Sequence, residues 1–189
     1  MEMRTANFKS EFRTREEETG EKIIAGYFIV YNQQAELWHN FFEEIASGAC
    51  TKSLNINDVR ALYNHDSNFV LGRKSAGTLM LKEDSYGVYG EIKINPNDSE
   101  AVNIYERVKR GDIDGCSFGF YSEYENEEYI KLTDDISKCI IKEADVREVS
   151  VCPFPAYPQT QISARKQDFE RKQDFEKRKK ELKERLRNG

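Results

Sequence analysis

The chain has 189 residues and a mass of 22.0 kDa, which is enough for one domain with its own hydrophobic core and a short appendage. Its charge is distributed unevenly along the chain. Residues 165–189 are basic, with 11 Lys/Arg and 6 Asp/Glu, whereas the other residues are acidic, with 18 Lys/Arg and 28 Asp/Glu. An acidic body argues against nucleic-acid binding, which needs clustered basic side chains, and no apolar run reaches the roughly 20 residues that span a bilayer.

The first half of the chain is predicted to form short strands separated by turns. Residues 3–12 and 22–31 are two β-prone runs around a polar connection, which predicts a hairpin. Residues 58–63 predict another strand, which runs into a polar loop at residues 64–68. The other elements expected in this half are a segment 41–50 that ends in a glycine turn, a helical turn that begins at Thr51 or Ser53, and a second hairpin of strands 78–82 and 88–94.

One helix is predicted in the body, over residues 98–110. Asn97 or Asp98 can cap its N-terminus, and Gly111 ends it. The apolar residues that form its predicted buried stripe are Val102, Tyr105 and Val108.

The second half of the body is again predicted to be strands, at residues 117–124, 129–132, 138–141 and 145–152. With one or two helices among many strands, the body is expected to be a β-rich barrel or sandwich.

The character of the chain changes past residue 162. The hexapeptide RKQDFE occurs twice in tandem, at residues 165–170 and 171–176, and is followed by a Lys- and Glu-rich segment. Such a segment cannot build a core of its own. We therefore divide the chain into a domain of residues 1–162 and a charged, partly helical tail of residues 163–189, which is either solvated or a docking helix for an acidic partner or a scaffold helix.

Two histidines are candidates for a catalytic base. Hydrolysis of a peptide bond at neutral pH needs an activated nucleophile and a base that titrates near pH 7, which favours histidine. His65 lies between an apolar strand and a polar loop, so it can be both fixed and exposed, whereas His39 lies beside large apolar residues. A lone histidine is more often structural, so a structural role for His65 stays open.

Ser117 is the candidate nucleophile. Gly115 and Gly119 lie two residues to either side of it, and glycines allow close approach of a substrate and dihedrals that other residues resist. The alternative is a glycine-rich strand in which Ser117 only bonds to backbone. Cys116 is a rival nucleophile, but strand alternation points it to the face opposite Ser117.

Glu148 is the candidate acid. Strand alternation places Val149 and Val151 on one face of residues 145–152, and Glu148, Ser150 and Cys152 on the other. A carboxylate on a half-buried face needs a partner, and the Nδ1–H of an imidazole is a suitable one. An ordinary ion pair with a neighbouring Arg or Lys is the alternative.

No metal or cofactor is predicted. The four cysteines include no Cys-x-x-Cys pair, and two histidines are too few for an ordinary zinc site. The cysteines are therefore expected to be free, buried thiols. They are Cys50, Cys116, Cys139 and Cys152.

Taken together, these segments resemble one family. The sequence is similar, from about residue 26 to residue 165, to the prohead (capsid maturation) serine proteases of tailed phages and prophages. The blocks that carry the resemblance are NHD and LGR at residues 64–73, SFGF at residues 117–120, and EVS and PAYP at residues 148–158.

The resemblance implies a β-rich α+β fold similar to the herpesvirus assemblins, with a closed, mainly antiparallel β-barrel core and a few surrounding helices. It implies a serine endopeptidase with Ser117 as nucleophile, His65 as base and Glu148 as the acid that orients His65. Asp66 and His39 stay open for the third position. Backbone N–H groups are the expected oxyanion donors, with Arg147 as a further candidate.

The same resemblance implies the partners and the place of action. The substrate would be the scaffolding segment of a phage major capsid protein, and the enzyme would also cleave itself, with residues 161–171 as an accessible stretch. It would act inside the assembling procapsid in the host bacterial cytoplasm, without nucleic-acid or membrane partners, and self-association as a dimer is a further hypothesis. The rival hypotheses are a non-catalytic capsid-assembly or scaffolding module and a cysteine peptidase that uses Cys116.

Overall fold

The computed structural model describes residues 3–9, 12–17, 20–154, 175 and 177–187. The chain forms two compact units, Met1–Ala156 and Tyr157–Gly189, and each is described by itself. The predicted boundary at residue 162 and the predicted self-cleavage stretch 161–171 lie outside the described residues. In the second unit, residues 175 and 177–187 are helical and their side chains are exposed.

The first unit is built mainly from strands, with two α-helices and one 3-10 turn among its described residues. The strands are β1 (Arg4–Lys9), β2 (Arg13–Glu16), β3 (Lys22–Val30), β4 (Gln34–Trp38), β5 (Phe41–Ile45), β6 (Arg60–Tyr63), β7 (Asp66–Arg73), β8 (Leu79–Glu83), β9 (Gly87–Ile94), β10 (Gly115–Tyr121), β11 (Glu127–Lys131), β12 (Ser137–Ile141) and β13 (Asp145–Cys152). The helices are α1 (Thr51–Ile56) and α2 (Ser99–Arg110), and the 3-10 turn is η1 (Tyr124–Asn126).

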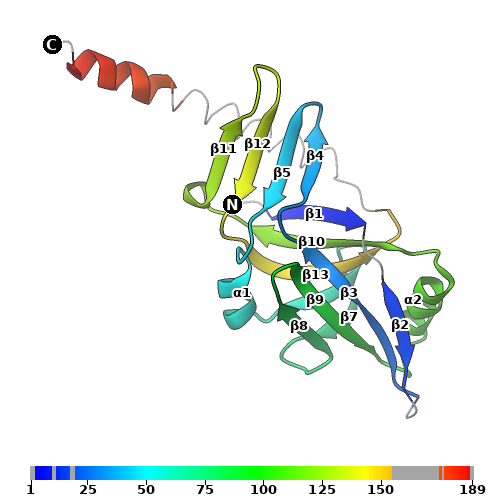
Figure 1. The fold of residues 1–189 in the computed structure, drawn as a ribbon. Helices are drawn as coiled ribbons and strands as arrows, with labels where there is room; N and C mark the ends of the chain where they lie inside the picture. Colours follow the sequence, from blue (N-terminus) through cyan, green and yellow to red (C-terminus); the bar gives the residue numbers. More distant parts are fainter. Residues whose placement is uncertain (1–2, 10–11, 18–19, 155–174, 176, 188–189) are drawn as a thin grey trace. The chain divides into compact units, whose positions relative to one another are not determined.

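The strands form three sheets, which confirms a β-rich fold with few helices (Figure 1). Their orders are β1-β10-β13-β6-β7, β11-β12-β5-β4 and β2-β3-β9-β8. The prediction of a closed, assemblin-like barrel is not supported, because each sheet has two open edges within the described strands. Two of the pairings, β13 with β6 and β12 with β5, are parallel and join strands that are far apart in sequence, which alternation of residues cannot reveal.

The predicted hairpin of residues 3–12 with residues 22–31 does not form, because the described part of residues 3–12 contains only β1. The strand that pairs antiparallel with β3 is β2, at residues 13–16, which lie outside the predicted strand. β1 pairs instead with β10, as the edge strand on the side away from β13 (Figure 1). The β propensity of residues 3–12 was sufficient to predict extended backbone, but it carries no information about the partner strand.

Several element predictions are confirmed. α2 begins after Asp98, whose carboxylate accepts hydrogen bonds from the N–H groups of Glu100 and Ala101 at 3.0 and 3.1 Å, and it ends at Gly111 with φ 86°. The β8–β9 hairpin and β13 also form as predicted. Val102 is only half-buried, and the buried residues of α2 are Ala101, Ile104, Tyr105 and Val108.

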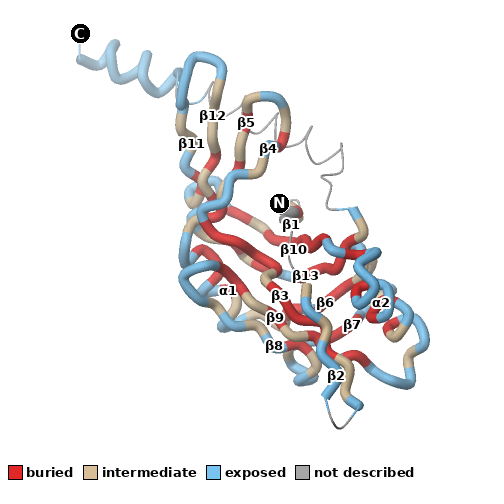
Figure 2. Tube along the Cα trace, turned by 45° about the vertical axis from the view of Figure 1, so that its right-hand side comes forward, coloured by how far each residue is buried: buried red, intermediate tan, exposed pale blue. Residues whose placement is uncertain are grey.

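The hydrophobic core lies along β3, β9, β10 and β13, where Figure 2 shows long stretches of buried chain. Phe28, Phe118 and Phe120 are fully buried there. All four cysteines are free and buried, as predicted. No described helix is long and apolar enough to cross a membrane.

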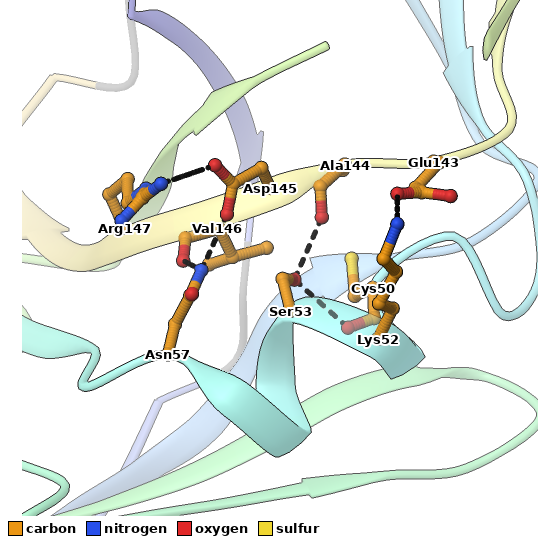
Figure 3. A network of polar contacts seen from close by, with 9 residues as sticks. All are labelled: Cys50, Lys52, Ser53, Asn57, Glu143, Ala144, Asp145, Val146 and Arg147. Atoms are coloured by element: carbon orange, nitrogen blue, oxygen red, sulfur yellow. Dashed lines mark hydrogen bonds and ion pairs between the residues drawn. The ribbon is translucent and has the colours of Figure 1, made fainter. Parts of the chain in front are cut away.

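Helix α1 is fixed to the start of β13 by polar contacts (Figure 3). The Ser53 hydroxyl donates to the Ala144 carbonyl at 2.7 Å, and the Asn57 amide donates to the Asp145 carboxylate at 2.6 Å and to the Val146 carbonyl at 2.8 Å. These bonds hold the first residues of the strand that carries Glu148.

Candidate active site

His65 lies in a tight turn rather than in the predicted polar loop. β6 and β7 pair as a hairpin whose two turn residues, Asn64 and His65, have φ 52° and 61°. Two-residue hairpin turns of type I′ need a positive φ at both turn residues. Residues other than glycine rarely adopt a positive φ. The turn is fixed to β13, because the Asn64 N–H donates to the Val151 carbonyl at 3.0 Å. A strained backbone at a histidine is a feature typical of functional sites.

The imidazole of His65 is bound by Glu148. Nδ1 of His65 lies 2.7 Å from Oε1 of Glu148, and the side chains are 24% and 5% exposed. An ionised carboxylate is an acceptor only, so the tautomer that fits this contact carries the proton on Nδ1. The other ring nitrogen, Nε2, is thereby left as the acceptor that a serine hydroxyl needs.

Ser150 closes a ring of hydrogen bonds around this pair. Its hydroxyl donates to Oε2 of Glu148 at 2.6 Å and accepts the backbone N–H of His65 at 3.2 Å. Ser150 is fully buried. Both carboxylate oxygens of Glu148 therefore have a donor, and His65 is bound through both its ring and its backbone.

Gly119 provides space for Glu148, which is a different role from the predicted conformational freedom. Neither Gly115 nor Gly119 has a positive φ, so neither needs glycine for its backbone. Gly119 is the cross-strand partner of Glu148, and a Cβ there would overlap Oε1 and lie 3.0 Å from Cγ of that side chain. The Glu148 carboxylate thus occupies the volume that a side chain at position 119 would fill.

Ser117 lies on the same face of the sheet, directly opposite Ser150. It is fully buried, and its hydroxyl donates to the Ala6 carbonyl of β1 at 3.0 Å. In the described structure no hydrogen bond joins Ser117 to His65. Cross-strand partners have Cβ atoms about 4.5–5.5 Å apart, so Ser117 lies one strand away from the ring that holds His65.

The cysteines near the site are buried. Cys116 faces the opposite side of β10, where its thiol donates to the Tyr27 carbonyl at 3.3 Å. Burial, together with the nearby Glu148 carboxylate, raises the pKa of the Cys152 thiol to about 12. A thiolate nucleophile is therefore not favoured at Cys152, and Cys116 lies on the face of β10 away from Glu148.

The other predicted candidates lie apart from this ring. His39 is in the turn between β4 and β5, in a different sheet, and the Asp66 carboxylate accepts hydrogen bonds from the backbone and side chain of Asn68. Arg147 pairs with Asp145 at 2.6 Å.

Within the described residues, no possible metal cluster includes the site residues, and the cavity that is described lies elsewhere. No group of three or more His, Cys, Asp or Glu side chains in the described ranges could hold a metal ion. A cavity of about 260 Å³ lies between α1 and the start of β13, and its lining includes Lys52, Asn57 and Arg147 (Figure 3). Ser117, His65 and Glu148 do not line it.

Comparison with known proteins identifies the family. The family model described as the caudovirus prohead serine protease matches residues 9–175. The chain belongs to this family. The prohead protease of Enterobacteria phage HK97 is 36% identical over 147 residues, which cover 76% of this chain. The match spans 60% of the length of that relative.

The fold has a counterpart of known structure. The capsid assembly protease of bacteriophage T4 matches with a TM-score of 0.54 and 11% identity, over 80% of this chain and 97% of that one. At this identity the match supports the fold alone. The β-rich architecture of this family member is therefore shared with the capsid assembly protease of bacteriophage T4.

Two features of the site were not predicted as functional. Ser150 was placed on the face of Glu148 by strand alternation, but its hydrogen bond to His65 depends on the tight turn, which the polar sequence at residues 64–68 does not reveal. The Ala6 carbonyl as acceptor for Ser117 depends on the pairing of β1 with β10, for which we find no sequence signal.

Proposed function

We propose that this chain is a serine endopeptidase that matures phage procapsids. It cleaves the scaffolding segment of the major capsid protein, and itself, inside the assembling procapsid in the host bacterial cytoplasm. The observation that carries the proposal is the 2.7 Å contact between Nδ1 of His65 and the buried Glu148 carboxylate, with a serine on the neighbouring strand. Family membership supports the same activity.

In the proposed mechanism His65 is the base and Glu148 the acid that orients it. Ser117 turns its hydroxyl from the Ala6 carbonyl toward Nε2 of His65 and attacks the scissile carbonyl carbon. His65 takes the hydroxyl proton and then gives it to the leaving amine, which leaves an acyl-enzyme. Water activated by His65 hydrolyses the acyl-enzyme and releases Ser117. Glu148 keeps the proton on Nδ1 and stabilises the imidazolium.

The mechanism requires a change at the edge of the sheet. Ser117 is fully buried and its hydroxyl is bonded to the Ala6 carbonyl of the edge strand β1, so we propose that a substrate reaches it when β1 separates locally from β10. Edge strands open at lower free energy than central ones, because they have a partner on one side only. β1 is therefore the segment whose movement gives access to the nucleophile.

A fluorophosphonate, which reacts with activated serine hydroxyls, tests the proposal on the purified full chain. We expect one adduct, located at Ser117 by mass spectrometry, and no adduct in Ser117→Ala. The expected fall in rate is about 10⁶-fold for His65→Ala and about 10⁴-fold for Glu148→Gln. Ser122→Ala, which removes another buried serine hydroxyl, is the matched control and keeps the wild-type rate.

Co-expression with the capsid protein identifies the substrate. Active chain, but not Ser117→Ala, is expected to produce a capsid protein shortened by its scaffolding segment, which mass spectrometry of the products measures. Adduct formation without shortening would restrict the proposal to peptidase activity on another substrate.

A non-catalytic capsid-assembly module is the second candidate, and one observation favours it. The Ser117 hydroxyl is already satisfied by the Ala6 carbonyl, as a purely structural serine would be. A folded chain that forms no adduct at Ser117 over prolonged incubation would decide for this module.

A further inference from the structure

We propose that Ser150 is a positioning residue of the site, which fixes His65 and Glu148 relative to each other. This inference rests on the proposed function, in which these two side chains act as base and orienting acid. Ser150 is the cross-strand partner of Ser117 but makes no described hydrogen bond to it, and in that mechanism it does not contact the scissile bond. It acts only through the two residues that it connects.

The contacts of Ser150 form a closed ring. The backbone N–H of His65 donates to the Ser150 hydroxyl at 3.2 Å, and this hydroxyl donates to Oε2 of Glu148 at 2.6 Å. The contact between Oε1 of Glu148 and Nδ1 of His65, at 2.7 Å, closes the ring. One hydroxyl, acting as both donor and acceptor, therefore connects the backbone of the base to the carboxylate that binds its ring.

This ring restricts the motions that would separate the acid from the base. A carboxylate bound through one oxygen can still rotate about its last bond, whereas Glu148 is bound through both oxygens. The backbone of His65 is in the left-handed region, and the bond from its N–H to Ser150 helps to hold it there. Ser150 is fully buried, so water does not compete for these bonds.

A structural serine would explain the burial of Ser150 but not its contacts. Ser53 shows the structural case, because it is buried and its hydroxyl donates only to backbone carbonyls, of Cys50 and Ala144 (Figure 3). Ser150 instead connects the Glu148 carboxylate on β13 to the backbone N–H of His65 in the β6–β7 turn.

The test has two measurements on the full chain. The first is the rate at which a fluorophosphonate labels Ser117. The second is the proton NMR signal of Nδ1–H of His65, recorded in chains that also carry Ser117→Ala, so that neither activity nor self-cleavage is needed. Ser150→Ala is expected to lower the labelling rate about 10–100-fold, as a displacement of roughly 1 Å does, and to shift or abolish the Nδ1–H signal.

Two variants separate positioning from stability. Ser53→Ala loses a buried hydroxyl of the same kind and is expected to keep the labelling rate within about 2-fold, together with the NMR signal, because its hydrogen bonds lie outside the ring. Ser150→Thr retains the hydroxyl and is expected to recover most of the labelling rate. If Ser150→Ala does not fold, Ser150→Cys, which keeps the volume and weakens the donor, takes its place.

The outcomes are distinguishable. An unchanged rate and an unchanged signal in folded Ser150→Ala would overturn the inference, as would an equal loss in Ser53→Ala. If the wild-type chain is not labelled at all, the proposed function fails. A His65 signal that then still depends on Ser150 would support the positioning of the pair independently.

Discussion

Gly119→Ala is expected to displace Glu148 and to inactivate the site without unfolding the chain. The new Cβ would overlap Oε1 of Glu148 and lie 3.0 and 3.1 Å from its Cγ and Cδ, inside the 3.4 Å at which ordinary contact begins. The carboxylate must therefore move, which breaks its bond either to His65 or to Ser150. Losing one hydrogen bond to a charged group costs about 1.5–3 kcal/mol. Replacing a glycine of ordinary backbone geometry offsets about 0.4–1 kcal/mol of this.

The net loss of unfolding free energy is expected to be about 0.5–2.6 kcal/mol, measured by guanidinium unfolding. The rate of fluorophosphonate labelling at Ser117 is expected to fall about 100-fold. Gly90→Ala is the matched control, since its Cβ would lie 2.8 Å from the Phe28 ring in the core. It should destabilise the chain and leave the labelling rate of the folded fraction unchanged. A wild-type rate in folded Gly119→Ala, or an equal loss in Gly90→Ala, would refute this reasoning.

Two further substitutions test the surroundings of the site. Cys116→Ala is expected to keep Ser117 labelling and to cost about 1–2 kcal/mol of stability, because the thiol fills core volume; inactivation by this change would favour the cysteine-peptidase hypothesis. Arg4→Met is expected to lower the unfolding free energy by about 3–5 kcal/mol, since it removes the cation that pairs with the buried Glu127 carboxylate at 2.5 Å and leaves there the neutral Tyr129 hydroxyl at 2.7 Å. Arg15→Met, which removes an exposed ion pair with Glu17, should change the unfolding free energy by less than about 0.5 kcal/mol. Equal losses of unfolding free energy in Arg4→Met and Arg15→Met would contradict the importance of burial.

Local sequence patterns predicted the elements better than their partners. α2 was predictable because Asp98 and Gly111 carry cap signals that act within one turn of helix. β13 was predictable from its alternation and its position before two prolines. The pairing of β1 with β10 and the three open sheets were not predictable, since both depend on which distant strand accepts the backbone hydrogen bonds. Strands β2, β4 and β7 have no counterpart among the predicted strands.

The candidate site was predictable as a set of residues, and less so as a geometry. The family resemblance named Ser117, His65 and Glu148, and alternation on β13 placed Ser150 beside Glu148. The contact of Glu148 with His65 depends on a parallel pairing of β13 with β6, which no local pattern encodes. Gly119 shows the limit most clearly, because a glycine that makes room for a cross-strand side chain is indistinguishable in sequence from one that bends the chain.

The left-handed turn at His65 makes hairpin formation and assembly of the base a single cooperative event. A non-glycine residue in this conformation costs roughly 1–2 kcal/mol, and a hydrogen bond to a buried carboxylate recovers about the same amount. The hydrogen bond to Glu148 therefore offsets the cost of the left-handed conformation at His65, and without that bond the cost is not offset. Loosening Glu148 would let the tip of the hairpin fray, so backbone amide exchange at residues 64 and 65 should report directly on whether the acid and the base are in contact.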